Sequence, residues 1–236
     1  VHNKLVEIIE QSEITSDSEL NICNSGIMIF NTKRLFENLK LIQNKNSKKE
    51  FYLTDLVQIF FKKGLRVDHF QSKFEETLGV NNMHDLSNVN NEFQKIKRNS
   101  FLSKGVIMQA PETIFFSHDT KVGNNVVIQP NVYFGPSVHI KDNVVIRSFS
   151  YLDNTIIYEE STIGPYARIR DGVVIKENSK VGNFVEIKKS KIDKNVKISH
   201  LSYIGDSTIN HSSNIGAGAI TCNYDGKKKN KTIIGE

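Results

Sequence analysis

The chain has 236 residues, of which 38% are hydrophobic and 24% carry charge, with 31 Lys and Arg against 26 Asp and Glu. A net charge of +5 suits anionic small ligands but is too small a surplus to indicate a nucleic-acid-binding protein. No apolar run approaches the roughly 18 residues that a membrane span requires, and we expect neither a secretory leader nor a membrane partner. The two cysteines, Cys23 and Cys222, lie far apart and without metal-type spacing, which is typical of reduced thiols in a cytoplasmic protein.

The first part of the chain, residues 1–84, alternates between strand-like and helix-like segments. Residues 26–30 form a short apolar run typical of a strand, and residues 54–61 have the spacing of an amphipathic helix. This alternation predicts α/β structure. The chain begins at Val1 and ends inside what reads as a repeat, so we expect it to be a piece of a longer protein.

A polar segment with regularly spaced apolar residues follows at residues 85–104. Its apolar side chains, Leu86, Val89, Phe93 and Ile96, recur every three or four residues, which predicts an amphipathic helical arm. A disordered linker is the alternative, because several of the intervening residues are Asn and Ser.

A six-residue repeat dominates residues 105–236. Large apolar residues recur at steps of six, with three steps of five, at Phe116, Val122, Ile128, Phe134, Ile140, Ile146, Leu152, Ile157, Ile163, Ile169, Ile175, Val181, Ile187, Ile192, Ile198, Ile204, Ile209 and Ile215. Small or β-branched residues recur four positions later, for example at Val126, Val132 and Val138. Because six is a multiple of the strand period of two, both positions can face inward in every repeat.

The residues between these positions are turn formers, such as 123–125 and 141–143. Short strands, regular turns and a continuous apolar core predict a parallel β-helix in which each coil buries its face on its neighbours. A β-sandwich with short strands is the alternative, but a sandwich does not hold one six-residue register over such a length.

Charged and ionisable residues that the repeat itself does not require are concentrated between residues 168 and 231. They include guanidinium groups at Arg168 and Arg170, the Glu186 carboxylate and an imidazole at His200, and the segment ends in a lysine-rich loop at 227–231. Taken singly, each is most simply a solvated surface group. A planar guanidinium is nevertheless well suited to phosphate, and an imidazole titrates near the pH at which a general base works.

Several strings in the sequence are specific enough to indicate a family. Residues 163–168, 181–189 and 214–226 closely resemble the acetyltransferase domain of the bifunctional N-acetylglucosamine-1-phosphate uridyltransferase/glucosamine-1-phosphate acetyltransferases. Residues 24–27, 51–55 and 79–82 are similar to the latter half of the uridyltransferase domain of the same family. The resemblance implies the latter part of an α/β nucleotidyltransferase domain at 1–84, a helical arm at 85–104, and a left-handed β-helix of hexapeptide repeats at 105–236.

The resemblance also implies an activity and a set of acetyltransferase residues. The activity is acetyl transfer from acetyl-CoA to the amine of glucosamine-1-phosphate, in a homotrimer with sites between subunits. His200 matches the general base, and Glu186 matches the residue that helps to orient the acetyl-transfer chemistry. The sugar and phosphate ligands match Arg170, Lys188, Tyr203, Asn214 and Lys229, and the acetyl-CoA side matches Ala217, Asn223 and Tyr224, where a backbone N–H could stabilise an oxyanion.

For the first part of the chain, the resemblance implies uridylyl transfer from UTP, which yields UDP-N-acetylglucosamine for cell-wall and lipopolysaccharide precursors. Glu10 and Asn24 match contacts to the uridine-diphosphate sugar, and Asn81 matches a ligand of Mg²⁺. The nucleotide loop and a metal-sharing aspartate of the family would precede Val1, and the last coenzyme A coils would follow Glu236.

Two departures from the family pattern are informative. Asp171 stands where the family usually has proline, which places a carboxylate beside the expected phosphate site and could loosen the loop. Gln11 and Ser12 replace the basic-acidic pair that usually follows the glutamate matched by Glu10.

Two other classes of function compete with this interpretation. One is a hexapeptide acyltransferase of other specificity or a solenoid carbonic anhydrase, although His118, His139, His200 and His211 fall at unrelated points of the repeat. The other is a non-catalytic solenoid that acts as a scaffold or regulatory subunit. Fold alone does not separate these possibilities.

Overall fold

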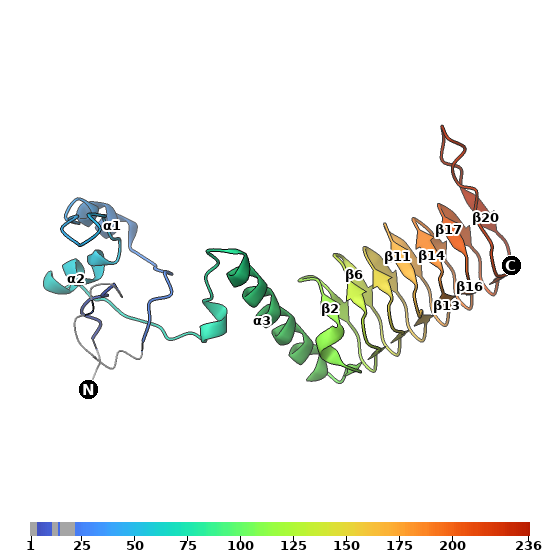
Figure 1. Cartoon of the computed structure of the whole chain (residues 1–236), viewed down its shortest axis with the longest axis horizontal. Coiled ribbons are helices and arrows are strands. Elements are labelled where there is room, and N and C mark those ends of the chain that lie inside the picture. The colour runs from blue at the N-terminus through green and yellow to red at the C-terminus, as the bar shows by residue number, and fades with distance from the viewer. Residues whose placement is uncertain (1–3, 11–13, 15–21) are drawn as a thin grey trace. The chain divides into compact units, whose positions relative to one another are not determined.

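The computed structural model describes residues 4–10, 14 and 22–236, and it divides into two compact units, residues 1–85 and 86–236. Figure 1 labels the elements, and each unit is considered by itself. None of the helices within the described residues is both long and apolar enough to cross a membrane.

The first unit is held together by a small helical core. Its described elements are α1 (Thr32–Leu39), α2 (Asp55–Lys62) and the 3₁₀ turn η2 (Phe74–Glu76). The Asn31 side chain accepts a hydrogen bond from the backbone N–H of Arg34 at 3.2 Å and so caps α1. Leu56, Val57 and Phe60 of α2 are buried. Helix α2 overlaps the predicted helical run at 54–61.

The predicted strand at residues 26–30 does not form in the described part of this unit. The segment has no ladder partner there, and Ile27 and Ile29 are 71% and 97% exposed. A strand exists only when a neighbour accepts and donates its backbone hydrogen bonds, and alternation in sequence does not supply that neighbour.

The second unit is a parallel β-solenoid whose coils contribute one strand to each of three sheets (Figure 1). Sheet A consists of β1 (Ile107–Met108), β4 (Val127–Ile128), β7 (Val145–Ile146), β10 (Thr162–Ile163), β13 (Lys180–Asn183), β16 (Lys197–His200) and β19 (Asn214–Ile215). Sheet B consists of β2 (Phe115–Phe116), β5 (Tyr133–Phe134), β8 (Tyr151–Leu152), β11 (Arg168–Arg170), β14 (Glu186–Lys188) and β17 (Tyr203–Gly205). Sheet C consists of β3 (Lys121–Val122), β6 (Val138–Ile140), β9 (Thr155–Ile157), β12 (Val173–Ile175), β15 (Lys191–Ile192), β18 (Ser207–Ile209) and β20 (Thr232–Ile234).

The solenoid core follows the predicted repeat. Every predicted inward apolar position is buried except Val122, which is partly buried against the same core. The second set of inward positions is buried as well, including Val126, Val132 and Val138. The prediction of a parallel β-helix is therefore confirmed, and the β-sandwich alternative is wrong.

Most corners of the solenoid are turned by a residue in the left-handed backbone region. Asn125, Asn143 and Asn195 have φ of 53°, 59° and 60°, and bulkier residues such as Phe184 (φ 55°) take the same role elsewhere. Asparagine tolerates this conformation better than most residues because its short amide can bond locally. The predicted turns at 123–125 and 141–143 are two of these corners.

Helix α3 (Met83–Leu102) packs on the first coil and satisfies the free edge of sheet B. The buried Gln94 amide donates to the Phe116 carbonyl at 2.8 Å and accepts from the Phe116 N–H at 2.9 Å. The Phe101 ring packs on the Phe116 ring with centroids 4.9 Å apart. Gln94 thereby replaces the strand that would otherwise be missing at this edge. The arm predicted at 85–104 overlaps this helix.

Replacing Gln94 by Ala should destabilise the second unit by about 2 kcal/mol, because the Phe116 N–H and C=O would remain buried without partners. Chemical denaturation followed by circular dichroism measures this change. Gln109→Ala, which removes an exposed glutamine near the same coil, serves as the matched control. Equal effects of the two variants would show that the edge contact does not stabilise the fold.

Candidate functional site

The alternation of sheet B places two columns of polar side chains on the outer face of the solenoid. Ile169, Ile187 and Ile204 are buried in the core, so the residues on either side of each point outward. Arg168 pairs in register with Glu186, which pairs with Tyr203. Arg170 pairs with Lys188, which pairs with Gly205. Residues that are 17 or 18 positions apart in sequence thus become neighbours.

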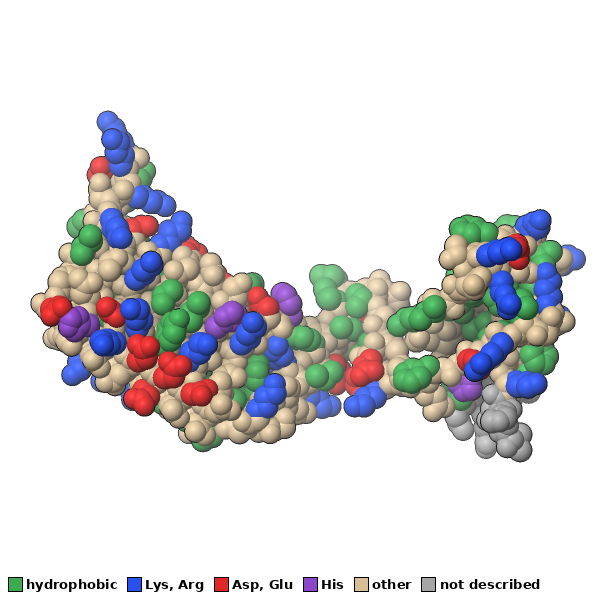
Figure 2. Space-filling view, turned by 180° about the vertical axis from the view of Figure 1, so that it is seen from behind, with side chains coloured by type: hydrophobic (Ala, Val, Ile, Leu, Met, Phe, Trp, Pro, Cys, Tyr) green, Lys and Arg blue, Asp and Glu red, His purple; other side chains and the backbone are tan. Residues whose placement is uncertain are grey.

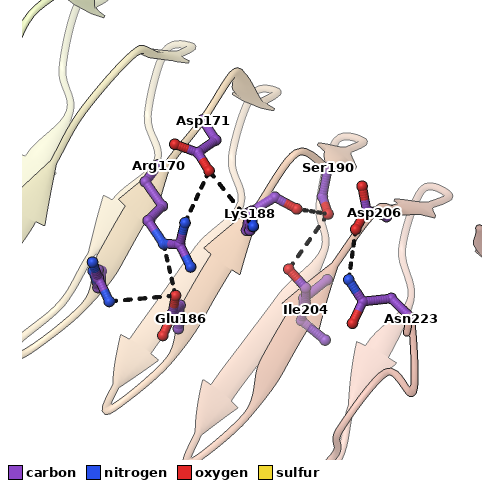
Figure 3. A network of polar contacts seen from close by, with 9 residues as sticks. Arg170, Asp171, Glu186, Lys188, Ser190, Ile204, Asp206 and Asn223 are labelled. Atoms are coloured by element: carbon purple, nitrogen blue, oxygen red, sulfur yellow. Dashed lines mark hydrogen bonds and ion pairs between the residues drawn. The ribbon is translucent and has the colours of Figure 1, made fainter. Parts of the chain in front are cut away.

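The charged groups of these columns form a single ion-pair cluster (Figure 3). Arg170 donates from Nε to Glu186 Oε1 at 2.8 Å and from Nη1 to Asp171 Oδ2 at 2.8 Å. Lys188 Nζ lies 3.8 Å from the same Asp171 oxygen. The hydrogen bond to Glu186 raises the pKa of Arg170 further above its ordinary value, and the two nearby carboxylates act in the same direction. The guanidinium is therefore fixed as a cation.

Arg168 adds a second guanidinium to Glu186. Its Nη1 lies 3.6 Å from Glu186 Oε1, so one carboxylate oxygen faces two arginines. Arg168 belongs to the arginine-rich stretch that drew attention in the sequence, but no site role was predicted for it.

Tyr203 and Asn223 lie beside Gly205, the register partner of Lys188. A Cβ added at Gly205 would lie 2.6 Å from the Tyr203 hydroxyl and 2.6 Å from Asn223 Nδ2, so only glycine leaves room for both side chains. Asn223 donates from Nδ2 to Asp206 Oδ2 at 2.5 Å (Figure 3). The sequence predicted Tyr203 on the sugar side and Asn223 on the acetyl-CoA side, and the structure brings them to the same glycine.

His200 ends strand β16 of sheet A, just before the corner residue Leu201 and three positions before Tyr203 of sheet B. Its Nδ1 lies 2.6 Å from Asn183 Oδ1, its register partner on the previous coil. In the neutral imidazole, the Asn183 amide oxygen accepts from an Nδ1–H, and this tautomer leaves the Nε2 lone pair free. The exposed Nε2 is thus available as a base.

Asn183 is a site residue that the sequence interpretation missed. It lies inside the string 181–189 on which the family resemblance depends, but no role was assigned to it. The signal was available, because Asn183 precedes His200 by one coil of 17 residues and the repeat frame makes them neighbours.

Two further predicted residues, Ala217 and Asn214, differ in how the structure relates them to His200. Ala217 precedes Gly218, whose backbone N–H donates to the His200 carbonyl at 3.4 Å. Asn214 instead pairs in register with Lys197 and lines a shallow depression with Asn178, Asn195 and Ser212. The cluster of Arg170 and Lys188 belongs to sheet B, so the structure does not bring Asn214 to it through strand register.

A hairpin arm projects from the last coils and carries Tyr224 and Lys229, which pair across it as an antiparallel bridge. Figure 2 shows basic side chains gathered on this arm, which contains the exposed residues Lys227, Lys228, Lys229 and Lys231. Asp225 accepts the backbone N–H groups of Lys228 at 2.6 Å and Lys227 at 2.8 Å. These bonds lower the pKa of Asp225 below its ordinary value, so its carboxylate stays ionised and holds the turn.

The three residues predicted for nucleotide and metal binding lie in the first unit. Glu10 is half-buried, Asn24 accepts a hydrogen bond from its neighbour Gly26, and the Asn81 N–H donates to Asp85 at 3.0 Å. Gln11 and Ser12 lie outside the described residues. Among the described residues there is no group of three or more His, Cys, Asp or Glu that could hold a metal. One exposed amide at Asn81 is not a sufficient donor set for Mg²⁺.

Comparison with known proteins identifies relatives of both the repeat and the whole chain. Residues 119–154 match the family model for the bacterial transferase hexapeptide (six repeats), and residues 151–236 match that for the GMPPB C-terminal domain. The bifunctional protein GlmU of Bartonella quintana (strain Toulouse) is 43% identical over 236 residues, which is 100% of this chain and 53% of the relative. The bifunctional protein GlmU of Bradyrhizobium diazoefficiens is 48% identical over 235 residues, 99% of this chain and 52% of the relative.

The chain matches the GlmU family along its whole length. The resemblance inferred from the sequence strings is thereby confirmed, and the hexapeptide match agrees with the left-handed β-helix expected from it. The chain spans about half the length of the GlmU relatives that it matches. Among solved structures, PerB from Caulobacter crescentus in complex with CoA and GDP-perosamine aligns with 56% of this chain and 60% of its own at 16% identity. The TM-score of this alignment is 0.31.

Replacing Asn183 by Ala should free the His200 Nδ1 and shift the imidazole toward the Nε2–H tautomer, because the acceptor that fixes the present tautomer is lost. Nitrogen-15 NMR of the labelled histidine ring reads the tautomer directly. Asn195→Ala removes another outward amide, one that accepts from Asn178 at 2.7 Å, and should leave His200 unchanged. A tautomer that is the same in the Asn183 variant and the wild type would contradict the orienting role.

Proposed function

We propose that this chain carries the acetyltransferase site of a GlmU-type enzyme, which transfers the acetyl group of acetyl-CoA to the amine of glucosamine-1-phosphate. The observation that carries the proposal is the 43–48% identity to GlmU proteins over essentially the whole chain. The polar groups on the outer face of sheet B and at the end of β16 support it, because they supply anion-binding and basic groups on a fold that otherwise needs neither.

In this proposal the phosphate is bound by Arg170 and Lys188. Both are cations on adjacent strands, and the Arg170 guanidinium offers parallel N–H donors that match phosphate oxygens. Glu186 holds the Arg170 Nε edge and so orients the guanidinium. Tyr203 and Lys229 are proposed to bind the sugar and phosphate as well, and Asn214 does so from sheet A.

The chemical step begins with His200. Its Nε2 removes a proton from the sugar amine as the amine nitrogen attacks the thioester carbonyl carbon, so a C–N bond forms and a tetrahedral oxyanion develops. Collapse of this species breaks the C–S bond, restores the carbonyl as an amide, and releases coenzyme A, whose sulfur takes up a proton. Ala217, Asn223 and Tyr224 are proposed to line the acetyl-CoA side, where a backbone N–H stabilises the oxyanion.

The whole protein is further proposed to transfer a uridylyl group from UTP to N-acetylglucosamine-1-phosphate with Mg²⁺. Glu10, Asn24 and Asn81 are the residues of this chain proposed for that activity. This part of the proposal is supported by the sequence identity to GlmU proteins, which extends over the first unit. The described residues do not form a metal site by themselves.

The alternative functions are less well supported. A carbonic anhydrase needs several metal-binding histidines together, and the described residues include no such group. A non-catalytic solenoid has no need for a cluster of cations and carboxylates on sheet B or for an oriented histidine at the end of a sheet A strand. An acyltransferase of other specificity remains as an outcome of the assay below.

Replacing His200 by Ala should reduce the kcat of acetyl transfer to glucosamine-1-phosphate by about 10²- to 10⁴-fold, because the amine would lose its general base. The assay follows release of the coenzyme A thiol in the protein at its natural length. His139→Ala, on sheet C, is the matched control and should keep its activity. Near-normal turnover of the His200 variant would remove it from the base role, and acetylation of a different amine in preference would favour the other-acyltransferase alternative.

We also propose a homotrimer in which neighbouring copies complete each site. Asn214 lies on sheet A while Arg170 and Lys188 lie on sheet B, so a second copy would allow residues of different sheets to meet. Analytical ultracentrifugation should therefore give a mass three times that of a single polypeptide chain. A monomeric mass at assay concentrations would contradict this arrangement.

A further inference from the structure

Asp171 sits between the two cations that are proposed to bind phosphate. Its Oδ2 lies 2.8 Å from Arg170 Nη1 and 3.8 Å from Lys188 Nζ (Figure 3). The side chains are only partly exposed, at 23% for Arg170, 21% for Lys188 and 35% for Asp171. One carboxylate oxygen thus lies within ion-pair distance of both groups that a phosphate would use.

The backbone fixes the place of residue 171 at the corner beside these cations. Asp171 follows directly on strand β11 and turns the corner with a φ of 62°, and Gly172 continues the turn with a φ of 86°. The Gly172 N–H donates to the Asn154 carbonyl of the previous coil at 2.8 Å, which ties the corner to the stack. The position of Asp171 is therefore set by the solenoid.

The two carboxylates near Arg170 have different relations to it. Glu186 lies on the neighbouring strand and takes the Nε edge, where a second guanidinium, Arg168, also approaches it. The Asp171 carboxylate accepts from Arg170 Nη1 and also lies near Lys188 Nζ. Of these two carboxylates, Asp171 is therefore the one that lies close to both Arg170 and Lys188. A phosphate and the Asp171 carboxylate are both oxygen acceptors of negative charge, so they repel one another and compete for the same donors.

We propose that Asp171 is a specificity-determining residue that acts as an internal competitor: its carboxylate occupies Arg170 and Lys188 in the free protein, and the phosphate of the substrate must displace it. The proposal rests on the proposed function in taking a phosphorylated sugar as the ligand. Asp171 sets the affinity for the phosphate group low and reserves the site for ligands with enough negative charge to displace a carboxylate.

The direct test measures binding of inorganic phosphate to the full chain by isothermal titration calorimetry. Asp171→Asn removes the charge and keeps a residue that tolerates the left-handed corner, and Asp171→Gly removes the side chain from a corner that glycine also tolerates. Both variants should bind phosphate about fivefold more tightly, the effect expected from losing a partly exposed charge competitor. Unchanged or weaker binding in the two variants overturns the proposal, because it means that Asp171 is irrelevant to the anion or organises the cations for it.

Two further variants make the result specific to this site. Asp193→Asn removes a comparable carboxylate, which pairs with Lys176 at 3.1 Å on sheet C, and should leave phosphate binding unchanged. Lys188→Ala should weaken it. If Asp193→Asn strengthens phosphate binding as much as Asp171→Asn does, the effect is one of net charge and the competitor role is wrong.

Acetyl-transfer kinetics separate this proposal from the function on which it rests. In Asp171→Asn the KM for glucosamine-1-phosphate should fall about fivefold while kcat changes little. If this variant acetylates the sugar with an unchanged KM, the proposed function is supported and the competitor role of Asp171 is wrong. If the Asp171→Asn variant binds phosphate more tightly but the protein acetylates no amino sugar, the competitor role of Asp171 is supported and the proposed acetyltransferase function is wrong.

Discussion

The structure depends on one constraint, which is that a large apolar side chain must enter the core at every fifth or sixth residue while most corners place one residue in the left-handed backbone region. The inward isoleucines supply the burial that holds the coils together. The corners reduce this stabilisation, because the left-handed conformation costs roughly 1–2 kcal/mol for a residue with a Cβ. Contacts between side chains of successive corners offset part of that cost: Asn178 donates a hydrogen bond to Asn195, and the Tyr166 ring stacks on the rings of Phe149 and Phe184.

This constraint leaves the outward positions free to carry chemistry. Because the coils that carry sheet B residues 168–205 add 17 or 18 residues each, their outward side chains align in columns a strand spacing apart. Arg170 and Lys188 meet in this way on sheet B, and Asn183 and His200 meet in this way on sheet A. A polar site can therefore be assembled on the surface without placing a charged group in the core.

The fold of the second unit was predictable because its pattern is repeated and self-consistent. The register made neighbours of residues such as Asn183 and His200 predictable too, once the coil length is counted. The Asp171 bridge was only half predictable: the sequence placed a carboxylate beside the expected phosphate ligands, but which donors it reaches depends on rotamers that periodicity does not contain. In the first unit the run at 26–30 resembled a strand locally, and local alternation does not reveal whether a pairing partner exists.

The corner that follows sheet B shows how the fold and the chemistry share the same residues. Asp171, Lys189 and Asp206 occupy this corner on three successive coils, with φ of 62°, 47° and 48°. Aspartate is favoured there because it tolerates the left-handed region, and each of the two aspartates also reaches a side chain of the polar face: Asp171 reaches Arg170 and Lys188, and Asp206 accepts from Asn223. A residue type that suits the corner thus also brings a carboxylate to the end of a cationic strand. The turn chemistry of the solenoid therefore tunes the charge of the site, and a substitution at this corner changes ligand affinity while the apolar core beneath it stays intact.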